Sequence, residues 1–134
     1  MSTQLPSPSR GAVIDAAFAE AFAADWIAAW NSHDLFRIFE HYADDFEMFS
    51  PIIVERMSQP GGVLRGKARI SEYWGRGIAS ATPPLRVGLR NVFVGVGSVT
   101  IVYDSVGRGL AAEVFEFDAA RRVIRGRAHY DPVV

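Results

Sequence analysis

The chain has 134 residues, the size of one domain, and 49% apolar with 22% charged residues is typical of soluble globular proteins. Its net charge of −1, from 14 basic and 15 acidic residues, argues against a nucleic-acid-binding protein. The absence of cysteine excludes disulfides and thiolate metal sites, and no apolar run approaches the roughly 18 residues of a membrane span. We therefore expect a cytoplasmic protein without a nucleic-acid or membrane partner.

The chain opens with a polar segment rich in Pro and Ser. Residues 1–12 lack the apolar run of a secretory signal, so we predict a disordered tail followed by one domain over residues 13–134. An Ala-rich helix is then predicted over residues 14–30. One apolar stripe recurs along it at every fourth position, namely Ile14, Phe18, Phe22, Trp26 and Trp30.

Three further elements follow before the chain becomes rich in β-formers. Asp34 is placed to cap a short second helix over 35–43, and alternation then predicts a strand that Pro51 ends. Residues 52–64 contain Ser-Gln-Pro-Gly-Gly and are predicted to form a loop. A third helix is predicted over 67–79.

The rest of the chain has the pattern of strands joined by short turns. The predicted strands are 85–96, 98–106, 109–118 and 122–131, and their short connections favour antiparallel hairpins. Helices followed by a strand meander indicate an α+β fold. The two Trp residues of the first helix are too bulky for a flat sheet, so we predict a cone-shaped, curved antiparallel sheet around three N-terminal helices, with an internal pocket.

Two clusters of charged residues have simple structural explanations. His41, Asp44 and Asp45 have helical ligand spacing, but they lie at a predicted helix end, so we predict no metal site. Four arginines gather at positions 121, 122, 125 and 127. We interpret them as a solvated hairpin or a salt-bridged sheet face rather than a phosphate-binding track.

Three polar residues interrupt otherwise apolar strands and are the first candidates for a functional site. Glu113 lies within Ala-Ala-Glu-Val-Phe, Ser50 ends the first predicted strand, and Tyr130 ends the last. Alternation alone leaves two alternatives for Glu113. It is either solvent-facing or a buried acid whose pKa is raised by desolvation.

Several long segments resemble a known family. WIAAWNSHDLFRIFEHYADDFEMFSP is similar to the helix–turn–helix–strand unit of ketosteroid isomerases and other SnoaL-like, nuclear-transport-factor-2-like proteins. RGKARISEYW resembles their third helix, and AAEVFEFDAARRVIRGRAHYD their last hairpin. The resemblance spans nearly the whole chain after residue 13 and supports the fold more specifically than any activity.

The resemblance places the isomerase site on a set of positions that is only partly retained. The oxyanion-hole tyrosine corresponds to Trp26, the general-base aspartate to Ser50 and the protonated oxyanion-hole acid to Glu113. Ketosteroid isomerases combine that base with a neutral carboxylic acid, and a serine cannot replace the base near neutral pH. The sequence therefore argues against standard ketosteroid isomerase activity.

The same resemblance implies the rest of the site. The supporting tyrosine positions fall on Tyr42 and Trp74, and the pocket wall of the last strand falls on Gly126, Ala128 and Tyr130. We thus expect Glu113, Ser50 and Trp26 as catalytic candidates, with His129 and Asp131 in reserve. The expected ligand-binding residues are Trp26, Tyr42, Met48, Trp74, Ala128 and Tyr130.

Two functions remain open from the sequence. One is a cofactor-independent cyclase, isomerase or hydrolase that acts on a small hydrophobic carbonyl compound by acid–base chemistry. The other is a non-catalytic ligand-binding or assembly module of the same fold. The resemblance also implies a homodimer through the outer sheet face, where Phe115 and Phe117, or their neighbours, would be exposed.

Overall fold

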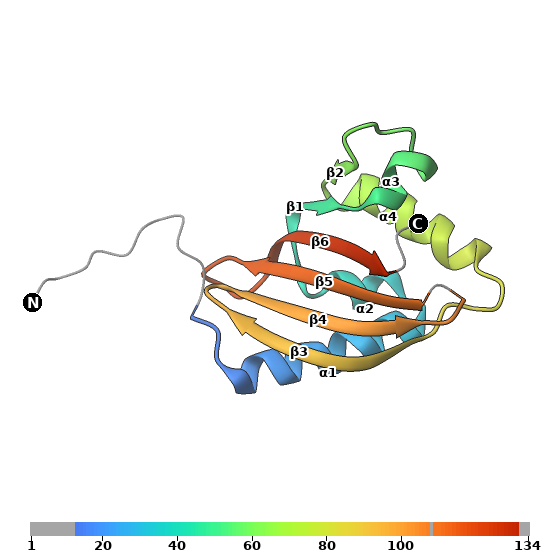
Figure 1. Cartoon of the computed structure of the whole chain (residues 1–134). Coiled ribbons are helices and arrows are strands. Elements are labelled where there is room, and N and C mark those ends of the chain that lie inside the picture. The colour runs from blue at the N-terminus through green and yellow to red at the C-terminus, as the bar shows by residue number, and fades with distance from the viewer. Residues whose placement is uncertain (1–12, 108, 132–134) are drawn as a thin grey trace, which may run out of the picture.

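A computed structural model describes residues 13–107 and 109–131, so the predicted tail 1–12 lies outside the described residues. One six-stranded sheet curls without closing, and the helices lie against its concave side and at one end (Figure 1). The α+β class and the curved sheet are confirmed. No helix in the described segments has the length and apolarity that a membrane span requires.

The described residues form four helices rather than the predicted three, and all four lie before residue 87. They are α1 (Ala16–Ser32), α2 (Leu35–Phe39), α3 (Pro51–Arg56) and α4 (Lys67–Ser80). The Asp15 carboxylate accepts a hydrogen bond from the Phe18 amide at the start of α1. Asp34 caps α2 as predicted, accepting from the amides of Phe36 and Arg37. These caps satisfy amides that a helix start leaves without a partner.

The strands are β1 (Tyr42–Phe49), β2 (Val63–Arg65), β3 (Val87–Gly95), β4 (Ser98–Ser105), β5 (Gly109–Phe117) and β6 (Val123–Asp131). Their order in the sheet is β2-β1-β6-β5-β4-β3. The predicted hairpins β3–β4, β4–β5 and β5–β6 are all antiparallel. The sheet is not antiparallel throughout, because β1 pairs with β6 in parallel, with Met48 opposite Gly126. The long crossover between these two strands permits that direction.

Two local predictions were wrong. The second helix ends at Phe39, so Tyr42 lies in β1 rather than on a helical face. The segment 52–64 is not a plain loop, since it contains all but the first residue of α3 and begins β2 at Val63. Pro51 does end β1, but it also occupies the first helical position, where its missing amide hydrogen costs nothing.

The core lies between the concave sheet face and the helices. Alternation on β4 and β5 turns Val99, Ile101 and Phe115 inward, where each is fully buried. Phe22 of α1 makes edge-to-face contacts with Phe115 and Phe117, with ring centroids 5.0 Å apart in both pairs. Phe115 and Phe117 are therefore core residues, and their neighbours Val114 and Glu116 occupy the outer face.

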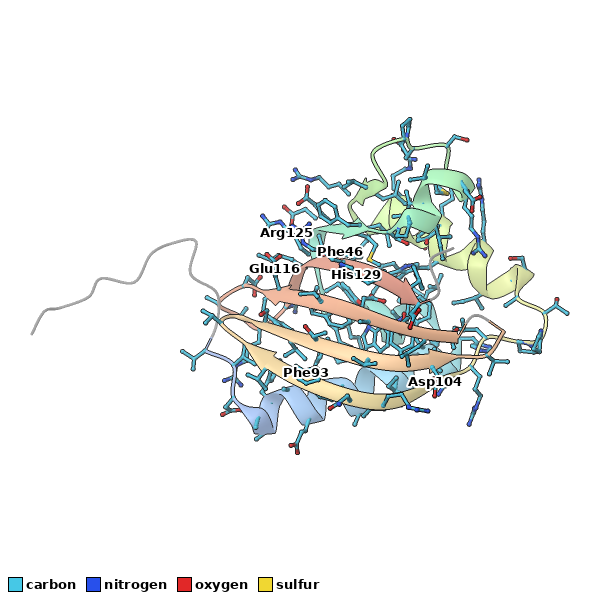
Figure 2. All side chains as sticks on the ribbon, in the orientation of Figure 1. Phe46, Phe93, Asp104, Glu116, Arg125 and His129 are labelled. Atoms are coloured by element: carbon cyan, nitrogen blue, oxygen red, sulfur yellow. The ribbon has the colours of Figure 1, made fainter. Side chains whose placement is uncertain are left out.

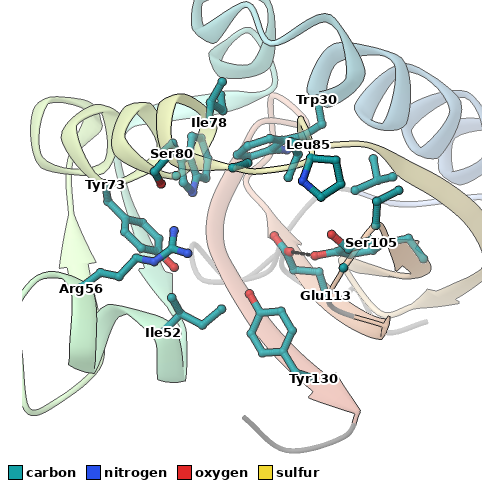
Figure 3. A pocket seen from close by; sticks show the side chains of 18 of the residues that line it. Trp30, Ile52, Arg56, Tyr73, Ile78, Ser80, Leu85, Ser105, Glu113 and Tyr130 are labelled. Carbon is teal, nitrogen blue, oxygen red and sulfur yellow. Dashed lines mark hydrogen bonds between the residues drawn. The ribbon is translucent and has the colours of Figure 1, made fainter.

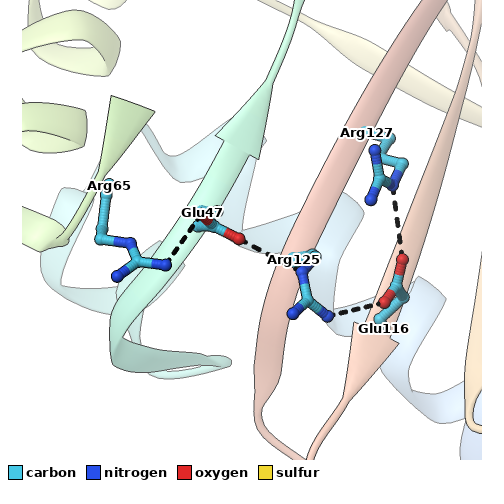
Figure 4. A network of polar contacts seen from close by, with 5 residues as sticks. All are labelled: Glu47, Arg65, Glu116, Arg125 and Arg127. Atoms are coloured by element: carbon cyan, nitrogen blue, oxygen red, sulfur yellow. Dashed lines mark hydrogen bonds and ion pairs between the residues drawn. The ribbon is translucent and has the colours of Figure 1, made fainter. Parts of the chain in front are cut away.

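The outer face carries charged and apolar side chains, including Phe93, Asp104, Glu116 and Arg125 (Figure 2). A network of ion pairs crosses β1, β6 and β5: Arg125 lies 3.2 Å from Glu47 and 3.0 Å from Glu116 (Figure 4). Arg127 also pairs with Glu116, at 3.4 Å. The interpretation of this arginine cluster as a salt-bridged sheet face is confirmed for these two residues.

Candidate functional site

A cavity of about 480 Å³ lies between the concave sheet face and helices α1, α3 and α4. Glu113 and Tyr130 enter it from β5 and β6, while Ile52, Arg56 and Tyr73 enter from α3 and α4 (Figure 3). Aromatic and aliphatic side chains form much of the remaining wall. These other residues include Trp26, Trp30, Met48, Trp74, Ile78, Leu85, Val87, Tyr103 and Ser105.

Glu113 is the buried carboxyl group of this cavity. The β5 alternation that turns Phe115 inward also turns Glu113 inward, and its exposed fraction is 5%. The Tyr103 hydroxyl donates a 3.0 Å hydrogen bond to Glu113 Oε1. Burial raises the pKa of Glu113 to about 7, and the hydrogen bond from Tyr103 only partly offsets this effect. The structure thus selects the buried alternative for Glu113.

An aromatic cluster surrounds this carboxyl group. Trp26 Nε1 donates a 3.0 Å hydrogen bond to the Tyr42 hydroxyl, and the Trp26 ring lies 5.1 Å from that of Tyr103. Trp30 contacts Trp74 edge-to-face at 4.9 Å. In the described structure, Trp30 Nε1 is buried without a hydrogen-bond partner. This N–H is a donor for which the protein itself supplies no acceptor.

The two buried tyrosines near Glu113 are held in their neutral form. Burial, together with the proximity of Glu113, raises the pKa of Tyr103 and that of Tyr42 well above the ordinary value. Each hydroxyl therefore keeps its proton at neutral pH. Tyr103 can donate its hydrogen bond to Glu113, and the Tyr42 hydroxyl holds Trp26 in place by accepting a hydrogen bond from its indole N–H.

Five of the predicted site residues line the same cavity, although they come from five different elements: Trp26, Met48, Trp74, Glu113 and Tyr130. Gly126 supports this arrangement indirectly. A Cβ atom at Gly126 would lie 3.2 Å from Met48 Sδ, so the glycine leaves room for Met48. Tyr42 is fully buried and lies outside the cavity lining.

Ser50 does not join this group. It lines a separate depression of about 270 Å³, together with Ala128 and His129. Its hydroxyl accepts a 3.1 Å hydrogen bond from the Ile52 amide and so caps α3. The expectation that Ser50 lines the same cavity as Trp26, Trp74 and Glu113 was therefore wrong. The Ser50 side chain instead caps helix α3, which was not predicted.

The reserve candidates also lie away from the cavity. His129 and Asp131 are exposed, and His129 Nδ1 lies 3.2 Å from the Arg127 carbonyl oxygen. Strand alternation already predicted that His129 faces away from Ala128 and Tyr130. In the described segments, no group of three His, Asp or Glu side chains could hold a metal ion.

Several lining residues were missed from the sequence, among them Tyr103, Ser105 and Arg56. Tyr103 is in phase with the buried Val99 and Ile101, so alternation alone could have placed it in the core. The same alternation would have found Ser105. Arg56 had no such signal, because the short helix that carries it was predicted to be a loop.

The fold is that of a known class of protein. The curled sheet packed on helices matches solved nuclear-transport-factor-2-like structures, among them one from Cytophaga hutchinsonii ATCC 33406. That structure is 14% identical, with 98% of this chain and 96% of that chain covered at a TM-score of 0.65. The family profile for the SnoaL-like domain matches residues 23–131, and this chain belongs to that family.

Two other solved structures place the chain among its relatives. It is similar to a SnoaL-like protein of unknown function from Burkholderia thailandensis E264, with 46% identity, 88% of this chain and 98% of that chain covered, and a TM-score of 0.83. It is also similar to a proposed polyketide cyclase from Sinorhizobium meliloti, at 14% identity, 78% and 89% coverage, and a TM-score of 0.63. No curated protein matches the chain in a sequence comparison.

Proposed function

We propose that this protein binds a small hydrophobic, carbonyl-bearing molecule in the cavity and uses Glu113 as an acid–base group on it. The observation that carries this proposal is a carboxyl group with a pKa of about 7 buried in an aromatic cavity. A carboxyl group with a raised pKa in a pocket lined by aromatic side chains marks a candidate reactive site.

The pKa of Glu113 suits proton transfer in both directions. Near neutral pH the acid and the carboxylate are both populated, so the group can take a proton from carbon and return it elsewhere on the ligand. The hydrogen bond from Tyr103 fixes Oε1 and restricts the orientation of the carboxyl group. This reduces the reorganisation that proton transfer would otherwise require.

The lining supports a flat ligand that carries oxygen. A volume of about 480 Å³ is in the range of ordinary ligand pockets, and Trp26, Trp30 and Trp74 offer ring surfaces. The buried N–H of Trp30 lacks an acceptor, and a ligand oxygen would supply one. The proposed polyketide cyclase among the structural relatives is consistent with a ligand of this kind.

A non-catalytic binding module is the second candidate function. It is favoured by the Trp26 N–H, which already donates to Tyr42, and by Ser50, which caps α3. Neither group is available in this state as the second partner that isomerase chemistry would require. Under this alternative, Glu113 forms a hydrogen bond with a ligand that is bound and released without reacting.

One experiment with 2-acetonaphthone, a flat aromatic ketone, distinguishes the catalytic from the non-catalytic function. Binding is followed by fluorescence of the lining tryptophans, and proton transfer by deuterium incorporation into the methyl group in D₂O. A catalyst accelerates incorporation by about 10²-fold or more over buffer, and Glu113→Gln abolishes this gain. Binding without incorporation supports the non-catalytic module. Absence of binding up to the solubility limit contradicts both.

Our proposal also includes a cytoplasmic homodimer that associates through the outer sheet face. The exposed aromatic ring of Phe93 on β3 supports this, since Phe93 is 54% exposed and lies beside Thr100 on the outer face. A second copy would cover it. Light scattering on Phe93→Glu against the wild-type protein tests the proposal, which predicts a dimer for the wild type and a monomer for the variant.

A further inference from the structure

Arg56 is a cation in the cavity wall that the protein itself does not neutralise. It lies in the last turn of α3, is exposed, and lines the same cavity as Glu113. Within the described residues it forms no ion pair, whereas Arg37, Arg65 and Arg125 each lie within 3.2 Å of a carboxylate oxygen. Other arginines of the described residues also form no ion pair, but they do not line the cavity, so Arg56 is the basic side chain that a ligand there would meet.

The structure also accommodates the Arg56 side chain over α4. A Cβ atom at Gly77 would lie only 3.1 Å from Arg56 Nη1, so the absence of a side chain there lets the guanidinium lie close to the helix. Ile52, one helical turn earlier on α3, contributes to the same wall. Figure 3 shows Arg56 beside Tyr73 and across the cavity from Glu113.

We infer that the ligand carries a carboxylate, which Arg56 binds, in addition to the carbonyl oxygen and apolar body of the proposed function on which this inference rests. A guanidinium is permanently charged and forms paired hydrogen bonds with a carboxylate in one plane. The aromatic wall would hold the body of the molecule between Arg56 and Glu113. The substrate class is thus narrowed to hydrophobic keto acids or related aromatic carboxylates.

A purely structural role for Arg56 gives a different expectation. A positive charge in the last turn of a helix stabilises the helix through its dipole. That role predicts a change in stability on substitution but no change in the preference between two ligands. Ligand preference is therefore the informative measurement.

The experiment measures the dissociation constants of 2-naphthoate and 2-naphthamide by calorimetry at about pH 6.5. The two probes share one aromatic body and differ in charge. We expect the wild-type protein to bind 2-naphthoate about tenfold more tightly than the amide, a modest ratio because Arg56 is exposed to solvent. Arg56→Gln should remove this preference and leave amide binding unchanged, while Arg56→Lys should retain part of it.

Arg90→Gln is the matched control. Arg90 lies on β3 away from the cavity lining and pairs with Asp104 at 2.7 Å, so its loss should change neither constant. If both probes bind and Arg56→Gln keeps the wild-type preference, or the wild type has none, the inference is overturned and the cavity remains a binding site. If neither probe binds the wild-type protein, the proposed function fails together with the inference.

Discussion

Two glutamates on strand β5 have different environments because they lie on opposite faces of the sheet. Glu113 points inward, where it is 5% exposed and has the Tyr103 hydroxyl as its hydrogen-bond partner. Glu116, three residues later, points outward and pairs with Arg125 and Arg127. The outer carboxylate is neutralised by arginine, whereas the inner one is desolvated without a cation. The inner face therefore holds a desolvated acid, and the outer face holds ion pairs that solvent screens.

The largest difference between the faces should appear in stability. Phe115→Ala removes a fully buried ring that contacts Phe22 and Trp26, so we expect a loss of about 3–5 kcal/mol in the free energy of unfolding. Its outward neighbour Val114 is the control, and Val114→Ala should cost about 1 kcal/mol or less. Urea unfolding at neutral pH measures both. Equal losses would mean that the inner face is not the core.

The pH dependence of stability isolates Glu113. Its folded pKa of about 7 lies above the ordinary value of 4.5, so between these pH values the folded state binds a proton that the unfolded state has lost. The bound proton therefore contributes fully to the free energy of unfolding below about pH 4.5, and this contribution is lost as pH rises to about 7. The expected loss in the free energy of unfolding is about 3 kcal/mol.

Glu113→Gln lacks this titration, and should be more stable than the wild type above pH 7 by a similar amount. Urea unfolding of both proteins between pH 4.5 and 8 gives the difference. Glu116→Gln, on the outer face, should retain the wild-type decrease. A wild-type profile parallel to that of Glu113→Gln would show that Glu113 is not desolvated.

A smaller effect is expected from the hydrogen bond to the buried carboxyl group. Tyr103→Phe removes the donor to Glu113 Oε1 and leaves the ring in place, at an expected cost of about 1 kcal/mol. Because this bond lowers the pKa of Glu113, its loss should raise that pKa further. Carbon NMR titration of the variant measures the direction. A lowered pKa of Glu113 would contradict the assigned role of Tyr103.

The smallest effect is expected on the outer face. Arg125→Met breaks contacts with Glu47 and Glu116, but Arg125 is 40% exposed, so solvent screening limits the expected loss to about 1 kcal/mol or less. Added salt should reduce this loss further. Unfolding measured at low and high ionic strength tests both points, and a loss comparable with that of Phe115→Ala would remove the contrast between the faces.

The spacing of apolar residues predicted most of the fold, because a helix or strand that is buried on one face needs apolar residues at regular intervals. The apolar stripe of α1, the inward strands β4 and β5, and helix α4 all follow from spacing alone. Helix α3 was not predicted because its six residues, which begin with Pro51, carry too little periodicity to distinguish a short helix from a loop. The direction of the β1–β6 pair depends on contacts distant in sequence and has no local signal.

The site was predictable to the extent that it follows strand alternation. Glu113 could be proposed as a buried acid, and Tyr103 could have been added by the same argument. Ser50 could not be placed correctly, since its role as a cap appears only once α3 exists. Arg56 depends on that helix too, and its proximity to Gly77 joins two elements that no sequence pattern links.

The most direct test of this account is the titration of Glu113 itself, followed through the carboxyl carbon by NMR in the wild-type protein and assigned with Glu113→Gln. We expect a midpoint near pH 7, because the carboxyl group is buried beside aromatic rings and has no cation paired to it. A midpoint near the ordinary value of 4.5 would show that the carboxylate is hydrated, and would contradict the proposed acid–base role.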